Sequence, residues 1–224
     1  MRVSVIIPVF NGANRLADAV ASVRPQLRDG DELIIVDDGS TDDTPDVIAG
    51  FGHGVTWMRQ DNAGNAAARN AGLRRATGEA VAFLDHDDVW APHRQAALLA
   101  ALLANSGVGI VVGRVDVTVE SRSTHSVLNG PRHATTHRPW HLDALLIRRE
   151  VFELVGMFDE SLRRAVDADW FMRVREAGVQ FHQIDEVTVT YRLHESNISR
   201  DVASSRRDLL LTLKGAIDRR RSRL

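Results

Sequence analysis

The sequence is poorest in cysteine and in aromatic residues. None of its 224 residues is cysteine, and aromatic residues make up only 5% of the chain. Without cysteine the chain has no disulfides, thiolate metal ligands or cysteine nucleophile, and a reducing cytoplasm is the location we expect. The net charge at pH 7 is only −2, so we expect no basic surface for nucleic acid and no nucleic-acid partner.

Long apolar runs are missing as well. The first 12 residues, MRVSVIIPVFNG, hold one basic residue and a short apolar run, with no small-residue cleavage site after it. This pattern is typical of a buried first strand rather than of a signal peptide. No window approaches the roughly 18 apolar residues of a membrane span, so we expect a soluble chain that contacts membranes at most peripherally.

The composition that remains is that of a globular domain. Hydrophobic residues make up 44% of the chain and charged residues 26%, which is enough for a full core. In the first half, β-branched runs alternate with helical patterns. We expect strands at 3–7, 32–37, 54–58 and 80–85, and helices at about 14–28, 42–50, 64–77 and 92–104. This order predicts an α/β fold with a doubly wound, mostly parallel sheet and helices on both faces.

The second half is less regular. We expect one or two strands at 108–120, a long loop at 121–141, a strand that enters a short helix, a helix that ends at Gly178, and a last strand. The final segment, 201–224, predicts a basic amphipathic helix. Such a helix could pack on the domain, which we favour, or lie on an anionic membrane surface through 205–224.

Acidic side chains gather where two of the predicted strands end. Asp37 and Asp38 lie in IIVDDGSTDDT, and Asp85, Asp87 and Asp88 lie in LDHDD. Ligands of parallel sheets bind beyond the carboxyl ends of the strands, and an Asp-x-Asp turn can bring two carboxylates onto one hard divalent cation. Alternatively, the second cluster is an acidic turn, with Asp88 as the N-cap of the next helix. Neither the G-x-G-x-x-G nor the G-x-x-x-x-G-K-[ST] phosphate loop is present, so any nucleotide is held by a different arrangement.

Five segments in a fixed order carry a family resemblance. They are VSVIIPVFNG, IIVDDGSTDDT, NAGNAAARNAGLRRATGEAVAFLDHDD, VGMFDESL and YRLHESNIS. Together they resemble the inverting family 2 glycosyltransferases, which have a GT-A fold, over roughly residues 3–199. The resemblance implies a single GT-A type domain at 1–200, with a nucleotide-binding half at 1–105 and an acceptor-binding half at 106–200.

The resemblance also implies a donor site. Its residues would be Pro8, Val9, Phe10, Asp38, Arg69 and Asp85. The segment after the first strand would hold the nucleotide base, and Asp38, rather than Asp37, would contact the uracil or the ribose. Arg69 would lie on the base or diphosphate side, and Asp85 would face the ribose and the metal.

A divalent cation is implied as well. Carboxylates would repel a nucleoside diphosphate without a cation between them, so we expect Mn²⁺ or Mg²⁺. Asp85, Asp87 and His194 are the expected metal ligands, although a surface histidine after an edge strand is the alternative for His194. The loop histidines lack the paired spacing of a zinc site, and we interpret them as ordinary loop polarity: His125, His133, His137 and His141.

The catalytic base is expected at the start of the helix that follows VGMFDESL. Asp167 matches the family's base, which deprotonates the acceptor hydroxyl for in-line attack on the anomeric carbon, and Asp169 is the alternative. Val166 replaces the usual Glu beside it. A carboxylate that only stabilises the helix N-terminus would look the same in sequence.

These features predict a metal-dependent inverting glycosyltransferase. Its donor would be a UDP- or dTDP-sugar and its acceptor a carbohydrate or glycoconjugate, with Trp140 as an aromatic on the acceptor side. The expected location is the cytoplasm, with peripheral contact to the inner face of the membrane left open. The alternatives are a sugar nucleotidyltransferase, which usually has a glycine-rich basic loop that this chain lacks, and a noncatalytic nucleotide-sugar-binding protein.

Overall fold

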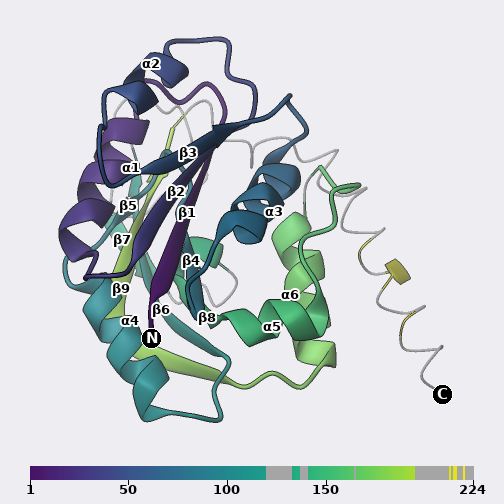
Figure 1. Ribbon diagram of the computed structural model, residues 1–224. Helices are drawn as coiled ribbons and strands as arrows, with labels where there is room; N and C mark the ends of the chain where they lie inside the picture. Colours follow the sequence, from purple (N-terminus) through teal and green to yellow (C-terminus); the bar gives the residue numbers. More distant parts are fainter. Residues whose placement is uncertain are drawn as a thin grey trace.

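The strands form a single mixed sheet (Figure 1). The computed structural model describes residues 1–119, 133–136, 141–163 and 165–194, and positions 212, 214, 215 and 219. Within these residues the sheet has nine strands in the order β3-β2-β1-β4-β8-β6-β9-β5, and β7 pairs with β6. The strands are β1 (Val3–Val9), β2 (Glu32–Asp37), β3 (Thr56–Arg59), β4 (Ala80–Phe83), β5 (Val89–Trp90), β6 (Ile110–Val119), β7 (His133–Thr136), β8 (Leu145–Arg148) and β9 (Phe181–Leu193). Most of them run in one direction, and β5, β7 and β8 are antiparallel to their neighbours.

Helices cover both faces of the sheet (Figure 1). On one face lie α1 (Leu16–Val23), α2 (Thr44–Ala49) and α4 (Arg94–Ala104), and on the other α3 (Asn65–Arg75), α5 (Arg149–Val155) and α6 (Val166–Glu176). Two 3-10 helices, η1 (Arg24–Gln26) and η2 (Leu142–Ala144), complete the described elements. The α/β fold class predicted from the sequence is confirmed.

The centre of the sheet holds the core. Every residue of β1 is buried, and β2 is buried after Glu32. Helix α3 comes so close to β1 that a Cβ at Gly72 would lie 2.4 Å from Cγ2 of Ile6. A glycine is therefore needed where this helix crosses the strand.

The strand register brings the polar segments to one edge. Val9 pairs with Asp37 in the parallel ladder of β1 and β2, and Ile6 pairs with Phe83 of β4. The segments that follow these three strands therefore leave the sheet at the same edge.

Three boundaries or elements differ from those predicted. Helix α1 ends at Val23, because Pro25 has no backbone N–H to continue it. Strand β4 ends at Phe83 rather than at 85. The predicted loop 121–141 contains a strand, β7, which pairs with β6. On this side of β6, residues 110–112 pair with β8, and the next part of the strand, 115–118, is left free to pair with β7.

The prediction that Asp88 is an N-cap is wrong. Strand β5 follows Asp88, and α4 begins only at Arg94, after His93 in a left-handed conformation with φ 63°. Oδ1 of Asp88 instead accepts the backbone N–H of Arg192 on β9 at 2.9 Å. The side chain thus connects the turn after β4 to a distant strand.

Most of the predicted C-terminal helix, 201–224, lies outside the described residues. The four described positions are helical, and Thr212 is buried. Nε of Arg219 donates to Oε2 of Glu176 on α6 at 2.9 Å. This contact joins position 219 to α6. No helix in the described part of the chain has the length and apolar character to cross a bilayer.

Candidate active site

The loops after β1 and β2 are joined to each other. The backbone N–H of Asn11, in a left-handed conformation with φ 51°, donates to Oγ of Ser40 at 2.9 Å, and Oδ1 of Asn11 accepts the N–H of Thr41 at 2.8 Å. Pro8 and Val9 are buried in β1, whereas the side chain of Phe10 is 43% exposed at the strand end. Of the three residues predicted to hold a nucleotide base, Phe10 therefore offers a free apolar face.

Asp38 holds the turn that leads into α3. Its Oδ1 accepts from Nε2 of Gln60 at 2.7 Å and from the N–H of Ala63 at 2.9 Å, and its Oδ2 accepts the N–H of Gly64 at 2.8 Å. The neighbouring Asp37 accepts the N–H of Ser40 and pairs with Arg59. Both carboxylates have structural partners, which explains how two adjacent charges are tolerated at one strand end. The contact of Asp38 with a donor stays a prediction.

A buried arginine joins the two halves of the domain. Nη2 of Arg69, on α3, donates to Oδ1 of Asp85 at 2.9 Å, and its Nη1 donates to Oδ1 of Asp167 at 2.6 Å. Burial would raise the pKa of Asp85, but the Arg69 guanidinium outweighs it and holds that pKa below its usual range. The predicted base, Asp167, and the first carboxylate of the Asp-x-Asp, Asp85, thus share the Arg69 guanidinium.

The two candidate bases on the first turn of α6 differ in exposure and in their partners. The side chain of Asp167 is 35% exposed. The side chain of Asp169 is only 7% exposed, and it pairs with Arg173 at 2.8 Å and with Arg219 at 3.5 Å. Asp167 is therefore the carboxylate that an acceptor could reach. Val166 is buried beside it and offers no polar group.

The second carboxylate of the Asp-x-Asp faces the predicted histidine ligand. Oδ2 of Asp87 lies 3.0 Å from Nε2 of His194. His194 is 6% exposed and therefore not the surface histidine of the alternative interpretation. The structure splits the predicted metal set into two pairs, because Asp85 faces Arg69 while Asp87 faces His194.

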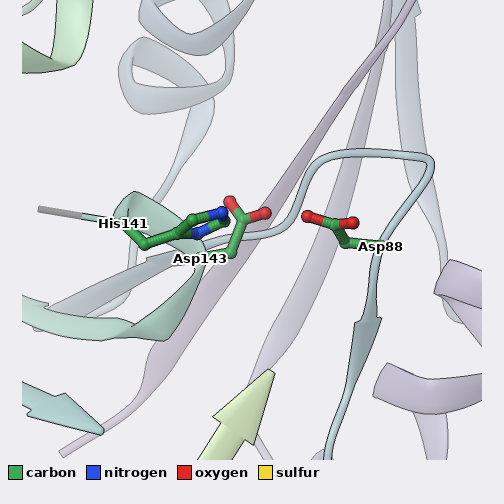
Figure 2. A group of neighbouring side chains, drawn as sticks. All are labelled: Asp88, His141 and Asp143. Carbon is green, nitrogen blue, oxygen red and sulfur yellow. The ribbon is translucent and has the colours of Figure 1, made fainter. Parts of the chain in front are cut away.

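A second acidic group lies next to these residues. Asp88, His141 and Asp143 each place a ligand atom within 4.8 Å of the others. Figure 2 shows the carboxylates of Asp88 and Asp143 facing each other, with the His141 ring beside Asp143. Oδ2 of Asp88 and Oδ1 of Asp143 are buried, and no donor in the described part of the chain reaches either oxygen. Two facing carboxylates in this state favour either a proton or a cation between them.

The titration of this group is shifted by its surroundings. Burial, and then the charge of Asp85, raise the pKa of Asp143 to about 8. Burial and the charges of Asp143 and Asp87 raise the pKa of Asp88 well above its usual range. His141, which the sequence analysis interpreted as ordinary loop polarity, lies in this group beside Asp143. His125, His137 and Trp140 lie outside the described residues.

Two residues of the site were missed in the sequence. Asp143 accepts the backbone N–H of Asp85 through Oδ2 at 3.1 Å, but in the sequence it stands in an apolar run with no acidic neighbour. Asn70 donates to the carbonyl of Phe158 at 2.9 Å and accepts its N–H at 3.0 Å. Its position directly after Arg69 in the ARN stretch was the only signal.

Two of the three tryptophans in the described residues, Trp90 and Trp170, belong to the core, whereas Trp57 on β3 is 45% exposed. Trp170 is fully buried and stacks on Phe152 with ring centroids 4.8 Å apart. Trp90 is 4% exposed, and the Arg94 guanidinium lies 3.9 Å from its ring centroid. Neither ring is available to stack on a sugar.

Comparison with known proteins places the chain in a family. Residues 4–164 match the family model described as glycosyl transferase family 2, and the chain belongs to that family. It is 32% identical over 205 residues to an uncharacterized glycosyltransferase of Rickettsia prowazekii, covering 86% of this chain and 64% of the relative. The chain thus spans somewhat less than two thirds of that relative's length.

Solved structures with the same fold carry nucleotide sugars. A mannosyltransferase of Pyrobaculum calidifontis in complex with GDP-Man and Mn²⁺ has a TM-score of 0.72 at 24% identity, covering 97% of this chain and 64% of that one. TarS of S. aureus in complex with UDP-GlcNAc has a TM-score of 0.71 at 18% identity, covering 90% of this chain and 61% of that one. At these identities the likeness concerns the fold.

Proposed function

We propose that the chain is a metal-dependent inverting glycosyltransferase. It moves a sugar from a UDP- or dTDP-sugar to a hydroxyl of a carbohydrate or glycoconjugate acceptor by direct displacement. The observation that carries this proposal is the bridge of Arg69 between Asp85 and Asp167. The bridge brings a half-exposed carboxylate of the second half of the domain to the Asp-x-Asp turn of the first half, where a donor and an acceptor would meet.

The side chains at this edge fit a divalent cation. Asp87 and His194 lie 3.0 Å apart, and Asp88 and Asp143 each have a buried oxygen that no donor in the described residues reaches. Carboxylate oxygens suit Mg²⁺ and Mn²⁺, and one imidazole is compatible with Mn²⁺. Asp85, Asp87 and His194 would hold the ion, and Asp88, His141 and Asp143 lie next to them. When bound, the ion supplies positive charge to the diphosphate leaving group.

The chain's own residues supply the other parts of the reaction. Phe10 offers a face on which the nucleotide base can stack. Asp167 accepts the proton of the acceptor hydroxyl as that oxygen attacks the anomeric carbon from the side opposite the leaving diphosphate, which inverts the centre. A positioned general base of this kind contributes about 10²- to 10⁴-fold to the rate.

A donor panel tests the proposal. The protein is incubated with Mn²⁺ and UDP-, dTDP- and GDP-sugars, and the nucleotide products are separated. Release of a nucleoside diphosphate that requires the metal is the expected result. Pyrophosphate-dependent exchange into the nucleotide sugar would indicate a nucleotidyltransferase instead. Binding of a nucleotide sugar without turnover, whichever acceptor is added, would indicate a noncatalytic binding protein.

The proposed setting is the cytoplasm, at or near the inner face of a membrane. Cytoplasmic location and peripheral contact through 205–224 both stay predictions. Within 205–224, the described Arg219 contacts Glu176 of α6.

A further inference from the structure

We propose that Arg69 is a positioning residue that sets the carboxylate of the base, Asp167, relative to the donor-side carboxylate of Asp85. This inference rests on the proposed function. It assigns Arg69 a task different from the base or diphosphate contact expected from the sequence. The arginine acts through the two carboxylates that it holds.

The first argument is the division of oxygens. Arg69 takes Oδ1 of Asp85 at 2.9 Å and Oδ1 of Asp167 at 2.6 Å through different terminal nitrogens. The second oxygen of each carboxylate makes no hydrogen bond within the described part of the chain. One oxygen on each side is therefore fixed, and the other is left for the cation or for the acceptor proton.

The second argument is depth. The side chain of Arg69 is 4% exposed, whereas those of Asp85 and Asp167 are 33% and 35% exposed. The guanidinium thus lies beneath two carboxylates that reach solvent. Substrates can meet the outer oxygens without meeting the arginine, which fits a supporting role better than direct contact with a diphosphate.

The third argument is that Arg69 is itself held in place. Its guanidinium carbon lies 5.7 Å from the centroid of the Phe158 ring. The adjacent Asn70 fixes the backbone of Phe158 by two hydrogen bonds and donates to Oε1 of Glu160 at 2.8 Å. Neighbouring residues of α3 therefore anchor both the segment that precedes α6 and the carboxylate on its first turn.

The geometry also explains why an arginine stands here. A guanidinium presents several donors in a rigid fork, so two of its nitrogens can hold two carboxylates at a set separation. A lysine would keep the charge but not this separation. Misplacement of a reacting group by about 1 Å can lower the rate roughly 10²-fold.

The test is Arg69→Lys in the full chain, with Arg173→Lys as the matched control. Arg173 also pairs with an aspartate of α6, at 2.8 Å, but that aspartate is Asp169. At saturating donor and acceptor we expect Arg69→Lys to lower kcat by about 10- to 100-fold. The Kd of the donor with Mn²⁺ should change by less than about threefold, because the arginine lies beneath the carboxylates. Arg173→Lys should leave both values near those of the parent.

Other outcomes overturn the inference. A normal kcat would show that charge alone suffices. A parallel loss of kcat and donor affinity would show that Arg69 acts on donor binding, directly or through Asp85, and not on the placement of the base. If Arg69→Lys does not fold, Arg69→Ala is assayed with and without millimolar guanidinium, which should restore kcat without changing the donor Kd. A folded Arg69→Ala protein that guanidinium does not reactivate contradicts the role. If the parent chain transfers no sugar at all, the proposed function itself has failed, which is a different result.

Discussion

At the scale of single residues, the site depends on how its carboxylates are neutralised. Asp85 and Asp167 share the Arg69 guanidinium, and Asp87 lies beside His194. Asp88 and Asp143 face each other, and each keeps one buried oxygen that no donor in the described residues reaches (Figure 2). The electrostatic cost of the metal-free site therefore falls on Asp88 and Asp143 rather than on the Asp-x-Asp pair.

This distribution predicts a pH dependence of stability. The pKa of Asp143 is about 8 in the folded protein and about 3.9 in an unfolded chain. Between these values the folded state binds more protons than the unfolded state, so the free energy of unfolding should fall as the pH rises. Denaturant unfolding of the protein in EDTA from pH 5 to pH 8 measures this slope.

The variant Asp143→Asn should flatten that slope. An asparagine keeps an oxygen for the backbone N–H of Asp85 but has no proton to lose. The exposed Asp29→Asn is the control, and its slope should match that of the parent. An unchanged slope in Asp143→Asn would refute the assignment of the pH dependence to this pair.

At the scale of elements, the site depends on how closely helices approach the sheet. Helix α3 carries Arg69 and Asn70, and it reaches β1 only because residue 72 is glycine. Asn70 also binds the backbone of Phe158, in the segment before α6, and Arg69 pairs with Asp167 on the first turn of α6. A small shift of α3 against the sheet would therefore displace Arg69 relative to both Asp85 and Asp167.

We expect Gly72→Ala to be destabilising. The added Cβ would lie 2.4 Å from Cγ2 of Ile6, and overpacking of this kind costs about 1 to 3 kcal/mol. That cost exceeds the gain of roughly 1 kcal/mol that alanine brings to a helix. Gly107→Ala is the control, since its Cβ would meet nothing within 4 Å. Equal free energies of unfolding for the two variants would contradict the close packing of α3.

The sequence predicted the elements better than the contacts between them. Apolar runs located β1, β2 and β4, because these strands are buried along nearly their whole length. They did not locate β7, whose pairing depends on how far β6 extends. Asp143 was also missed, because its apolar neighbours predicted a strand and only the folded chain brings it to Asp85.

At the scale of the whole molecule, two halves of the chain contribute to one sheet edge. The first half supplies Phe10, Asp38, Arg69 and Asp85, and the second supplies Asp167 and His194. The sequence predicted these residues together, with Arg69 on the donor side and with Asp167 as the base in preference to Asp169. The pairing of Asp169 with Arg173 and Arg219 favours Asp167. That choice is the centre of the proposed function.

The most direct test compares Asp167→Asn with Asp169→Asn. Both variants are assayed for sugar transfer with Mn²⁺ and the donor that the parent uses, and donor binding is measured separately by thermal shift. Asp167→Asn should lose at least about 10²-fold in kcat and still bind donor, whereas Asp169→Asn should retain most of its activity. Near-normal transfer by Asp167→Asn, or the larger loss in Asp169→Asn, would contradict the account.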